Sequence, residues 1–138
     1  MLKRVCLALW LLPLAACGGG STPTAPTPVK VVLRGGTFSA GSHTATFVDF
    51  QAPTSGQLTI TVSWLDPANP IFVDVSASCT TTQFVAGVCQ FQFSDRSSPV
   101  AAKKTASGVS VAAGFYTLIL SNLGPVSETV TYEVDLTS

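Results

Sequence analysis

Hydrophobic and polar residues alternate along most of the chain after residue 30. In residues 57–64 every second residue is large and apolar, and the residues between them are Gln, Thr or Ser. The same alternation runs through residues 128–137. A repeat of two places all apolar side chains on one face of an extended strand, whereas a helix needs a repeat of 3.6. Both segments are therefore predicted to be half-buried β-strands.

A third strand is predicted at residues 115–121, where both faces are largely apolar. This pattern is typical of a central strand with covered faces, so we expect it to lie deep in the domain. Weaker patterns predict strands at residues 31–33, 44–51, 71–78, 89–94, 100–104 and 107–112.

Turn-forming residues separate these strands. They gather at residues 35–36, 41–42, 53–56, 66–70, 97–99, 113–114 and 122–125. Gly permits positive φ, Pro fixes φ, and short polar side chains bond to nearby backbone groups, so all of them favour turns. No stretch has a convincing helical repeat. Residues 30–138 are therefore predicted to form an all-β domain of two antiparallel sheets packed face to face, a β-sandwich.

The first 16 residues have the layout of a cleaved secretory signal peptide. Lys3 and Arg4 precede an apolar run at residues 5–16. A helix needs about 20 apolar residues to cross a bilayer, so a signal is favoured over a permanent span. The cations before the run fit an amino end that stays in the cytoplasm.

The residues at the end of this run, Leu14-Ala15-Ala16-Cys17, resemble the lipobox of bacterial lipoproteins. The resemblance implies cleavage after residue 16, a diacylglycerol thioether on Cys17 and an acylated amino group, palmitate being a typical chain. Two or three acyl chains hold a protein in a membrane, whereas one binds reversibly. Gly18 stands where Asp retains lipoproteins at the inner membrane, which favours the outer membrane. The alternative is a plain secretory signal with a chance cysteine.

Residues 17–29 are predicted to be the lipidated amino terminus and a disordered linker. They contain three successive glycines and three prolines, with no aromatic or charged residue, so they cannot build a core. Extended geometry at about 3.1 Å per residue would hold the domain up to ~35 Å from the lipid surface. Glycosylation of the linker is an open alternative.

Two parts of the domain resemble bacterial pre-peptidase C-terminal domains. The first comprises residues 47–64 with Phe72-Val73-Asp74-Val75, and the second comprises residues 113–122 with Val130-Thr131-Tyr132-Glu133-Val134. The resemblance implies a jelly-roll-like β-sandwich without catalytic activity, and some domains of this family bind collagen or polysaccharide. This chain departs from the family because no peptidase sequence stands before the domain.

The four cysteines have three predicted fates. Cys6 leaves with the signal, Cys17 is lipidated, and Cys79 and Cys89 remain as a pair. Oxidation of two thiols is expected in an exported domain, so a disulfide is predicted. Closing a loop of about 11 residues stabilises the domain by nearly 3 kcal/mol in the chain-entropy model. A zinc site or a redox-active pair is the alternative, but no histidine neighbours the pair and its spacing is wide.

Composition and charge narrow the possible partners. The chain is 46% hydrophobic and only 10% charged, and Ser and Thr supply most of its polarity. Residues 30–138 carry five cations against seven carboxylates, which leaves a net charge of −2. Without a basic stripe to neutralise phosphates, nucleic acid is excluded as a partner.

No catalytic residue, cofactor or metal site is predicted. The single histidine, His43, is expected to be a solvated turn residue, and adjacent Ser42 does not make it a catalytic pair. Phosphate-binding, zinc-helix and nucleophile-elbow motifs are absent from the sequence. The oxygens of Asp66, Asn69 and Asp74 are too few for calcium, so turn formation and surface solvation are the expected roles.

Four aromatic residues were considered as contact sites. Trp64 continues the apolar face of its strand and is expected in the core, because a sugar-stacking ring would have to be exposed. Phe84, Phe91 and Phe93 are also expected in the core, and an exposed patch there would mark a contact surface.

The expected function is a non-enzymatic binding or structural module for polysaccharide or protein, held in the bacterial cell envelope by a lipid anchor. A subunit of an envelope assembly is one alternative, and it would use a free sheet edge or an aromatic patch. A small hydrolase is another, and it would require convergent acid, base or nucleophile groups.

Overall fold

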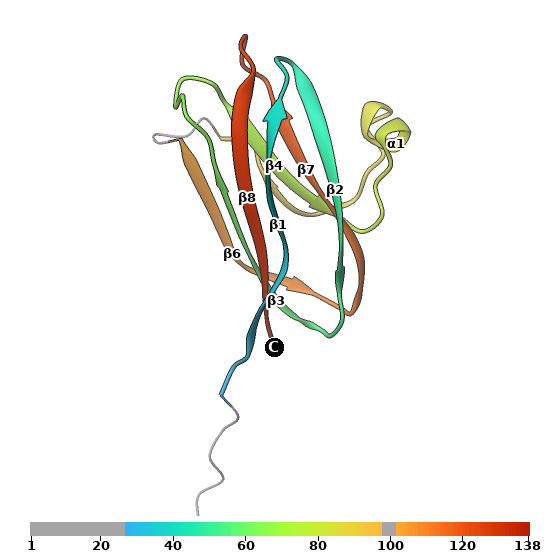
Figure 1. Ribbon diagram of the computed structural model, residues 1–138. Coiled ribbons are helices and arrows are strands. Elements are labelled where there is room, and N and C mark those ends of the chain that lie inside the picture. Colours follow the sequence, from blue (N-terminus) through green and yellow to red (C-terminus); the bar gives the residue numbers. More distant parts are fainter. Residues whose placement is uncertain (1–26, 98–101) are drawn as a thin grey trace, which may run out of the picture.

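The computed structural model describes residues 27–97 and 102–138 (Figure 1). The predicted signal peptide, Cys17 and linker residues 17–26 lie outside the described residues, as do residues 98–101. The described elements, in chain order, are β1 (Lys30–Ala40), β2 (Thr44–Ala52), β3 (Gly56–Ser63), β4 (Ile71–Ser76), α1 (Thr81–Val85), β5 (Phe91–Asp95), β6 (Lys103–Val111), β7 (Gly114–Asn122) and β8 (Glu128–Thr137). With five residues in α1, no helix in these ranges is long enough to cross a membrane.

The strands form two four-stranded antiparallel sheets. Sheet A has the order β1-β8-β3-β6, and sheet B has the order β2-β7-β4-β5. The sheets pack face to face, and the chain changes sheet between consecutive strands except from β4 to β5, which both belong to sheet B (Figure 1). The predicted all-β antiparallel sandwich is confirmed.

Alternating residues of the inner strands fill the space between the sheets. The buried apolar side chains of β3 and β8 meet those of β4 and β7, as in Leu58, Ile60, Val134, Val73 and Leu118. These residues are at most 1% exposed. The strands predicted at residues 57–64 and 128–137 therefore face the core as the alternation indicated. Trp64, 6% exposed, belongs to the same core, as predicted, and its indole N–H donates to the Asp66 carbonyl at 2.8 Å.

β1 is much longer than the predicted strand at residues 31–33. It continues through Gly35 and Gly36, which the sequence analysis had assigned to a turn, and pairs with β8 as far as Ala40. A Cβ on Gly36 would lie 3.2 Å from the Tyr132 hydroxyl. Gly36 therefore gives the Tyr132 side chain room on the neighbouring strand, and the turn prediction was wrong.

β6 also differs from the prediction of two separate strands at residues 100–104 and 107–112. One strand spans Lys103–Val111, and Gly108, with φ of +75°, is the extra residue opposite the step between Leu58 and Thr59. A glycine with positive φ is the usual insertion of a β-bulge, so the strand bends without ending. Residues 100–101 of the predicted strand lie outside the described residues.

The two ends of the domain lie together. Val29 and Ser138 exchange backbone hydrogen bonds of 3.1 and 3.2 Å, so the chain reaches β1 beside the carboxyl terminus (Figure 1). The loops before β4 and before β8 lie at the opposite, distal end. There the buried Asn69 amide donates to the Val126 carbonyl and to the Glu128 carboxylate, at 3.0 and 3.1 Å.

Candidate functional site

The outer face of sheet B, which points away from the core, is organised in cross-strand rows. From the distal end toward the chain ends, the first to fourth rows are Ala45-Ser121-Phe72, Phe47-Ile119-Asp74, Asp49-Thr117-Ser76 and Gln51-Phe115. Ile119 in the second row is fully buried although it alternates with core residues Leu118 and Leu120. A second covering layer must therefore lie over this face.

The covering layer is the segment between β4 and β5, which contains α1. The sequence predicts a wide loop here, but Thr80 and Gln83 form a capping box that starts a helix. The Thr80 hydroxyl accepts from the Gln83 backbone N–H, and the Gln83 side chain accepts from the Thr80 N–H at 2.9 Å. Gly87, with φ of +69°, follows the helix end. These two reciprocal bonds satisfy free N–H groups of the first turn, which explains the helix.

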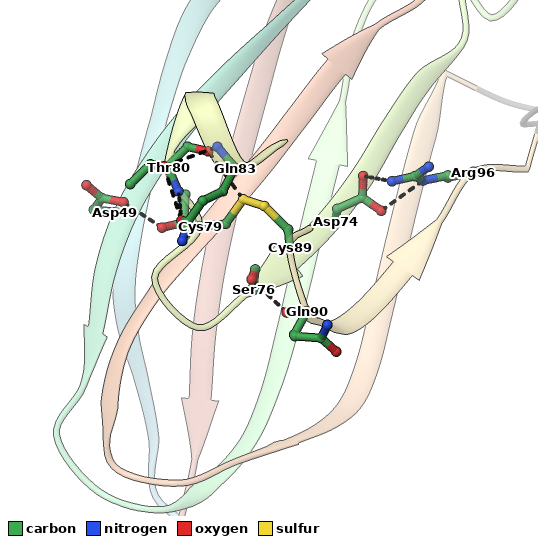
Figure 2. The surroundings of a disulfide bond; sticks show 10 residues. Asp49, Asp74, Ser76, Cys79, Thr80, Gln83, Cys89, Gln90 and Arg96 are labelled. Carbon is green, nitrogen blue, oxygen red and sulfur yellow. Dashed lines mark hydrogen bonds and ion pairs between the residues drawn. A yellow bond between two sulfur atoms is a disulfide. The ribbon is translucent and has the colours of Figure 1, made fainter. Parts of the chain in front are cut away.

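The disulfide between Cys79 and Cys89 closes this segment at its base, so the predicted bridge is present (Figure 2). The Ser76 hydroxyl donates to the Gln90 carbonyl at 2.6 Å, which fastens the second end of the segment to β4. The Phe84 ring of α1 packs edge-on against Phe47 of the second row, with 5.5 Å between ring centroids. The segment therefore covers the second row. In the flanking rows Ser76, Thr117 and Ser121 are buried as well, whereas Ala45 and Phe72 on one side and Asp49 on the other stay partly or fully exposed.

The third and fourth rows form one wall of a groove of about 450 Å³. Phe47, Asp49, Phe115 and Thr117 come from the sheet, and the opposite wall comes from residues 78–81 of the covering segment. Phe115 is 67% exposed, so its ring is available to a ligand. The prediction that residues 115–121 are covered on both faces was wrong at Phe115, because the covering segment stops short of the fourth row.

The groove continues around the edge of sheet B. A second hollow of about 300 Å³ shares Asp49 and Phe115 with the groove and adds Leu33 and Arg34 of β1. The Thr117 hydroxyl donates to one oxygen of the Asp49 carboxylate at 2.8 Å. This bond fixes the carboxylate and leaves its other oxygen as an acceptor in the groove. The arrangement offers aromatic surface, a carboxylate and hydroxyls along an elongated path.

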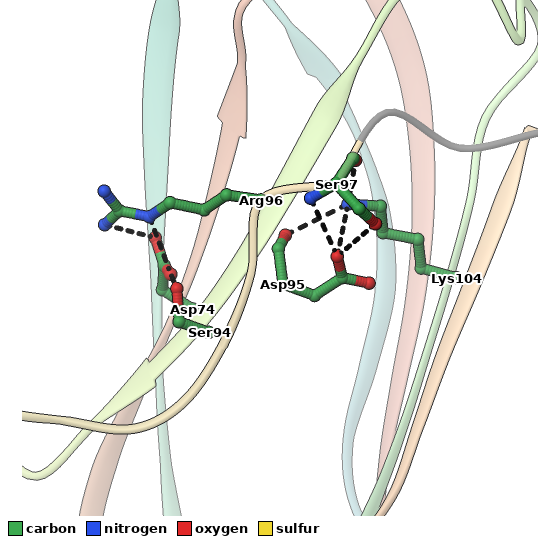
Figure 3. Close-up of polar contacts among 6 residues, drawn as sticks. All are labelled: Asp74, Ser94, Asp95, Arg96, Ser97 and Lys104. Carbon is green, nitrogen blue, oxygen red and sulfur yellow. Dashed lines mark hydrogen bonds and ion pairs between the residues drawn. The ribbon is translucent and has the colours of Figure 1, made fainter.

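A separate pocket of about 230 Å³ lies over the first row, on the other side of the covering segment. His43, Asp74 and Ser121 all line it. Figure 3 shows that the Asp74 carboxylate accepts from Ser94 and, at 3.3 and 3.1 Å, from Nε and Nη2 of Arg96. No hydrogen bond among the described residues joins His43 to Asp74 or Ser121. The three side chains are therefore not connected as a base and nucleophile would be.

The junction between the two sheets holds the strongest local set of polar contacts. Lys104 of β6 is buried, and its ammonium donates to the Asp95 carboxylate at 3.2 Å and to the Ser97 carbonyl at 2.8 Å (Figure 3). Burial alone would raise the pKa of Asp95, but the Ser97 hydroxyl and N–H, with Lys104, lower it below its usual value. This corner ties β5 to β6 and supports the face from its edge.

The acidic residues considered for calcium do not come together. Asp66 accepts from the Ala68 N–H at 2.9 Å in the distal loop, which confirms its turn role. Asp74 lies on the outer face of sheet B and is 1% exposed, so the expected surface solvation was wrong. Hydrogen bonds from Ser94 and Arg96 take the place of water at the Asp74 carboxylate. Within residues 27–97 and 102–138, no group of three His, Cys, Asp or Glu side chains could hold a metal ion.

The phenylalanines near the bridge divide between the two layers. Phe93 packs against the core, as expected. Phe84 is half-buried on the outer face, and Phe91 is 37% exposed beneath the Arg96 guanidinium, so the core prediction was wrong for both. His43 lies in the β1–β2 turn with φ of +53° and is exposed, as predicted.

Sequence reasoning missed the groove residues Phe47, Asp49, Thr117 and Phe115. Asp49 within an aromatic strand was one available signal, since a carboxylate there must reach solvent or a donor. The T-x-x-Q pattern at residues 80–83 was the other, because it marks a helix start in a segment that otherwise resembles a loop.

Comparison with known proteins gives no family for this chain. No protein-family model matches it, and no curated protein matches it at a significant level.

Proposed function

We propose that this chain is a lipid-anchored module of the bacterial cell envelope, a non-enzymatic β-sandwich that binds polysaccharide. The ligand lies in the groove on the outer face of sheet B. The observation that carries the proposal is the exposed Phe115 ring beside the fixed Asp49 carboxylate.

The chemistry of the groove matches a sugar. The C–H faces of a pyranose ring are apolar and suit an aromatic surface such as Phe115. Its hydroxyls need both acceptors and donors, which the Asp49 carboxylate and the Thr81 hydroxyl supply. Carboxylates and hydroxyls fix the orientation of a ligand while the ring supplies contact area.

The shape of the groove favours a chain over a single small molecule. The main groove and the adjoining hollow share Phe115 and Asp49, so the surface continues past the edge of β2 to Arg34. Both hollows are open to solvent. A polymer can pass through an open path of this kind, and each added unit contributes contacts.

The proposed anchor is Cys17 in the lipobox-like Leu14-Ala15-Ala16-Cys17. Val29 lies beside Ser138 at one end of the sandwich, so a linker attached there leaves the sides of the domain free. The groove is on such a side. Lipid would hold the module at the outer membrane, the linker would space it, and the groove would face the polysaccharide layer.

Binding is tested with the full-length lipidated protein in detergent micelles. The probes are peptidoglycan sacculi, envelope polysaccharide, chitohexaose, cellohexaose and dextran, measured by affinity electrophoresis and calorimetry. At least one glycan is expected to bind, and Phe115→Ala is expected to weaken it roughly tenfold, about 1.4 kcal/mol. Asp49→Asn should weaken it too, since it removes a charged acceptor.

Leu65→Ala is the matched control, because Leu65 is an exposed apolar residue at the distal end, far from the groove. It should leave glycan binding unchanged. Failure of every glycan to bind, or equal binding by wild type and Phe115→Ala, contradicts the proposal.

The anchor is tested in cells. Cys17→Ala is expected to move the protein from the detergent-extracted membrane fraction to the soluble exported fraction. Mass spectrometry of the mature wild type should find acyl chains on residue 17. Unchanged membrane association of Cys17→Ala contradicts lipidation.

A second candidate function, a subunit of an envelope protein assembly, is favoured by one observation. Leu65, Leu123 and Val126 are exposed by 45–79% on the distal loops. The Leu123 N–H donates to the Pro70 carbonyl, and Asn69 donates to the Val126 carbonyl, so the loops are braced together. If Leu65→Ala disrupts a native complex while glycans do not bind, this second function replaces the first.

A further inference from the structure

The pocket over the first row of sheet B is distinct from the polysaccharide groove. The covering segment separates them, because Phe84 lines the pocket while Thr80 and Thr81 line the groove. At about 230 Å³ the pocket is smaller than the ~300–1,000 Å³ typical of sites for drug-sized ligands. Its occupant is therefore a small molecule or a single terminal group.

A buried hydroxyl in this pocket lacks a partner. Ser121 lies between Ala45 and Phe72 in the first row and is 6% exposed. Its Oγ makes no hydrogen bond within the described residues. An unpaired buried polar group costs about 1–3 kcal/mol, so a ligand that accepts from this hydroxyl recovers that free energy. A structural role alone gives no reason for a hydroxyl rather than a methyl group at this position.

The polar groups left for a ligand are mainly donors. The Asp74 carboxylate already accepts from Ser94 and from two N–H groups of Arg96. A guanidinium has five N–H groups, so Arg96 keeps others beyond those that bind Asp74. The exposed His43 ring adds a further N–H at the rim. A ligand group with acceptors only, such as a carboxylate, fits this set.

Asp74 also prevents Arg96 from moving away. The carboxylate is 1% exposed and holds both Nε and Nη2 of the guanidinium, which fixes its plane. The Phe91 ring lies 5.3 Å from the guanidinium carbon and supports it from another side. A donor that is already oriented loses less entropy when a ligand binds.

The remaining walls are apolar. Phe72 comes from β4, Phe84 from the covering segment and Leu123 from the loop before β8. Phe84 is held by Phe47 and by the segment that the disulfide closes, so this wall is formed before a ligand arrives. The walls therefore suit a compact apolar body attached to the carboxylate.

The backbone at the rim carries strain. His43 has φ of +53°, a left-handed conformation that glycine adopts without penalty and other residues adopt at a cost of about 1–2 kcal/mol. Backbone strain of this kind clusters at ligand sites, where the side chain is needed at that position.

From these observations we infer that the first-row pocket binds a small organic carboxylate, with the acid group on Ser121, Arg96 and His43 and the apolar body against Phe72 and Phe84. The carboxylate can belong to a free acid or to a uronic acid of a glycan. Both sources offer the same two oxygens, and the test separates them.

The test uses full-length protein in detergent micelles and two-dimensional amide NMR. Butyrate and benzoate are titrated beside butyramide and benzamide, and glucuronate beside glucose. A saturable shift at residues 43–45 and 121–123 is expected with a carboxylate, and its neutral partner should bind roughly tenfold more weakly. Strongest binding of benzoate or butyrate indicates a free acid, and strongest binding of glucuronate indicates a uronic acid.

Two variants distinguish a ligand site from a structural role. Ser121→Ala should weaken the carboxylate roughly tenfold yet keep or raise the melting temperature, because the unpaired hydroxyl is gone. His43→Gly should weaken binding and retain stability, because glycine tolerates positive φ. Thr105→Ala, at an exposed position on the outer face of sheet A, is the control and should bind as wild type does.

Three results would overturn the inference. They are the absence of a saturable shift with every carboxylate, equal affinity for acids and their neutral partners, and wild-type affinity in both Ser121→Ala and His43→Gly. Because Phe115→Ala leaves this pocket intact, failure of the polysaccharide proposal does not affect the outcome.

Discussion

The outer faces of the two sheets differ in how they meet the solvent. Sheet A presents mainly hydroxyl and charged side chains: Thr37 and Thr131 of neighbouring strands share a hydrogen bond of 2.9 Å, and Lys30 forms an ion pair with Asp135. Sheet B presents Phe72, Phe47 and Ile119, and the disulfide-closed segment lies over the row that contains Phe47 and Ile119. The polar side chains of sheet A are themselves hydrated, whereas the apolar side chains of sheet B are shielded from water by the covering segment.

The difference explains where the candidate sites lie. A face covered completely would be a second core, and a face of hydroxyls alone would offer little contact area. On sheet B the covering segment protects the second row, and beyond its two margins the apolar side chains of Phe72 and Phe115 stay partly exposed. The groove lies at one margin of the covering segment and the first-row pocket lies at the other. The positions of both candidate sites are therefore set by where the covering segment ends.

The largest expected effect comes from the covered row. Ile119→Ala should lower the free energy of unfolding by about 2–5 kcal/mol, because it removes a fully buried side chain. Thr105→Ala on the outer face of sheet A should cost under about 1 kcal/mol. Urea denaturation measures both. Similar losses for the two variants would mean that the outer face of sheet B is not a packed layer.

The next effect concerns the bridge that closes the cover. Replacing both Cys79 and Cys89 by Ala should lower the free energy of unfolding by about 3 kcal/mol, because the unfolded chain regains the entropy of the closed loop. Binding at the groove should weaken as well, since Thr80 and Thr81 lose their position. Thermal melting with and without reductant is the measurement. Reductant should lower the melting temperature of wild type and leave that of the double variant unchanged. Any other pattern contradicts the prediction that the disulfide stabilises the domain by closing the covering segment.

The smallest effect is a pH dependence at the corner where the sheets meet. The pKa of Asp95 is lowered from its usual 3.8 in the folded state, so its stabilisation is present above about pH 4 and is lost as the pH falls through the lowered value. Ser97→Ala removes one hydrogen bond to this carboxylate. Its destabilisation should be under about 1 kcal/mol near pH 6 and should decrease as the pH falls through the lowered pKa of Asp95. Urea titrations at several pH values measure this, and a loss that does not change with pH would exclude the carboxylate as its source.

The two faces also differ in how far the sequence predicts them. Strict alternation in residues 57–64 and 128–137 predicted β3 and β8 and the polar outer face of sheet A, because one pattern specifies both faces of a strand. In residues 115–121 both faces are apolar. This pattern predicts that another part of the chain packs on the outer face of the strand, but it does not indicate which part. The cover comes from a segment far away in sequence, so local pattern could not assign Phe115 to its uncovered edge.

The structural roles of several glycines also could not be predicted from the sequence. Gly35 and Gly36 have the sequence of a turn but lie within β1, because pairing with β8 along its whole length outweighs their local preference. Gly124 lies in the predicted turn at the distal end, where its N–H donates to the Asn122 side chain and a Cβ would overlap the Asn69 side chain. Close approach between segments therefore requires glycine at Gly36 within a strand and at Gly124 within a turn, and only the folded arrangement reveals it.

The pairing of β1 with β8 has a mechanical consequence. The chain reaches β1 at Lys30, and the pairs from Lys30–Thr137 to Ala40–Glu128 lie along the direction in which a tether would pull. Antiparallel hydrogen bonds run perpendicular to their strands, so a tensile load along β1 shears them all at once instead of breaking them one after another. If the proposed anchor holds the amino end, the domain would therefore resist force through the full length of its first strand.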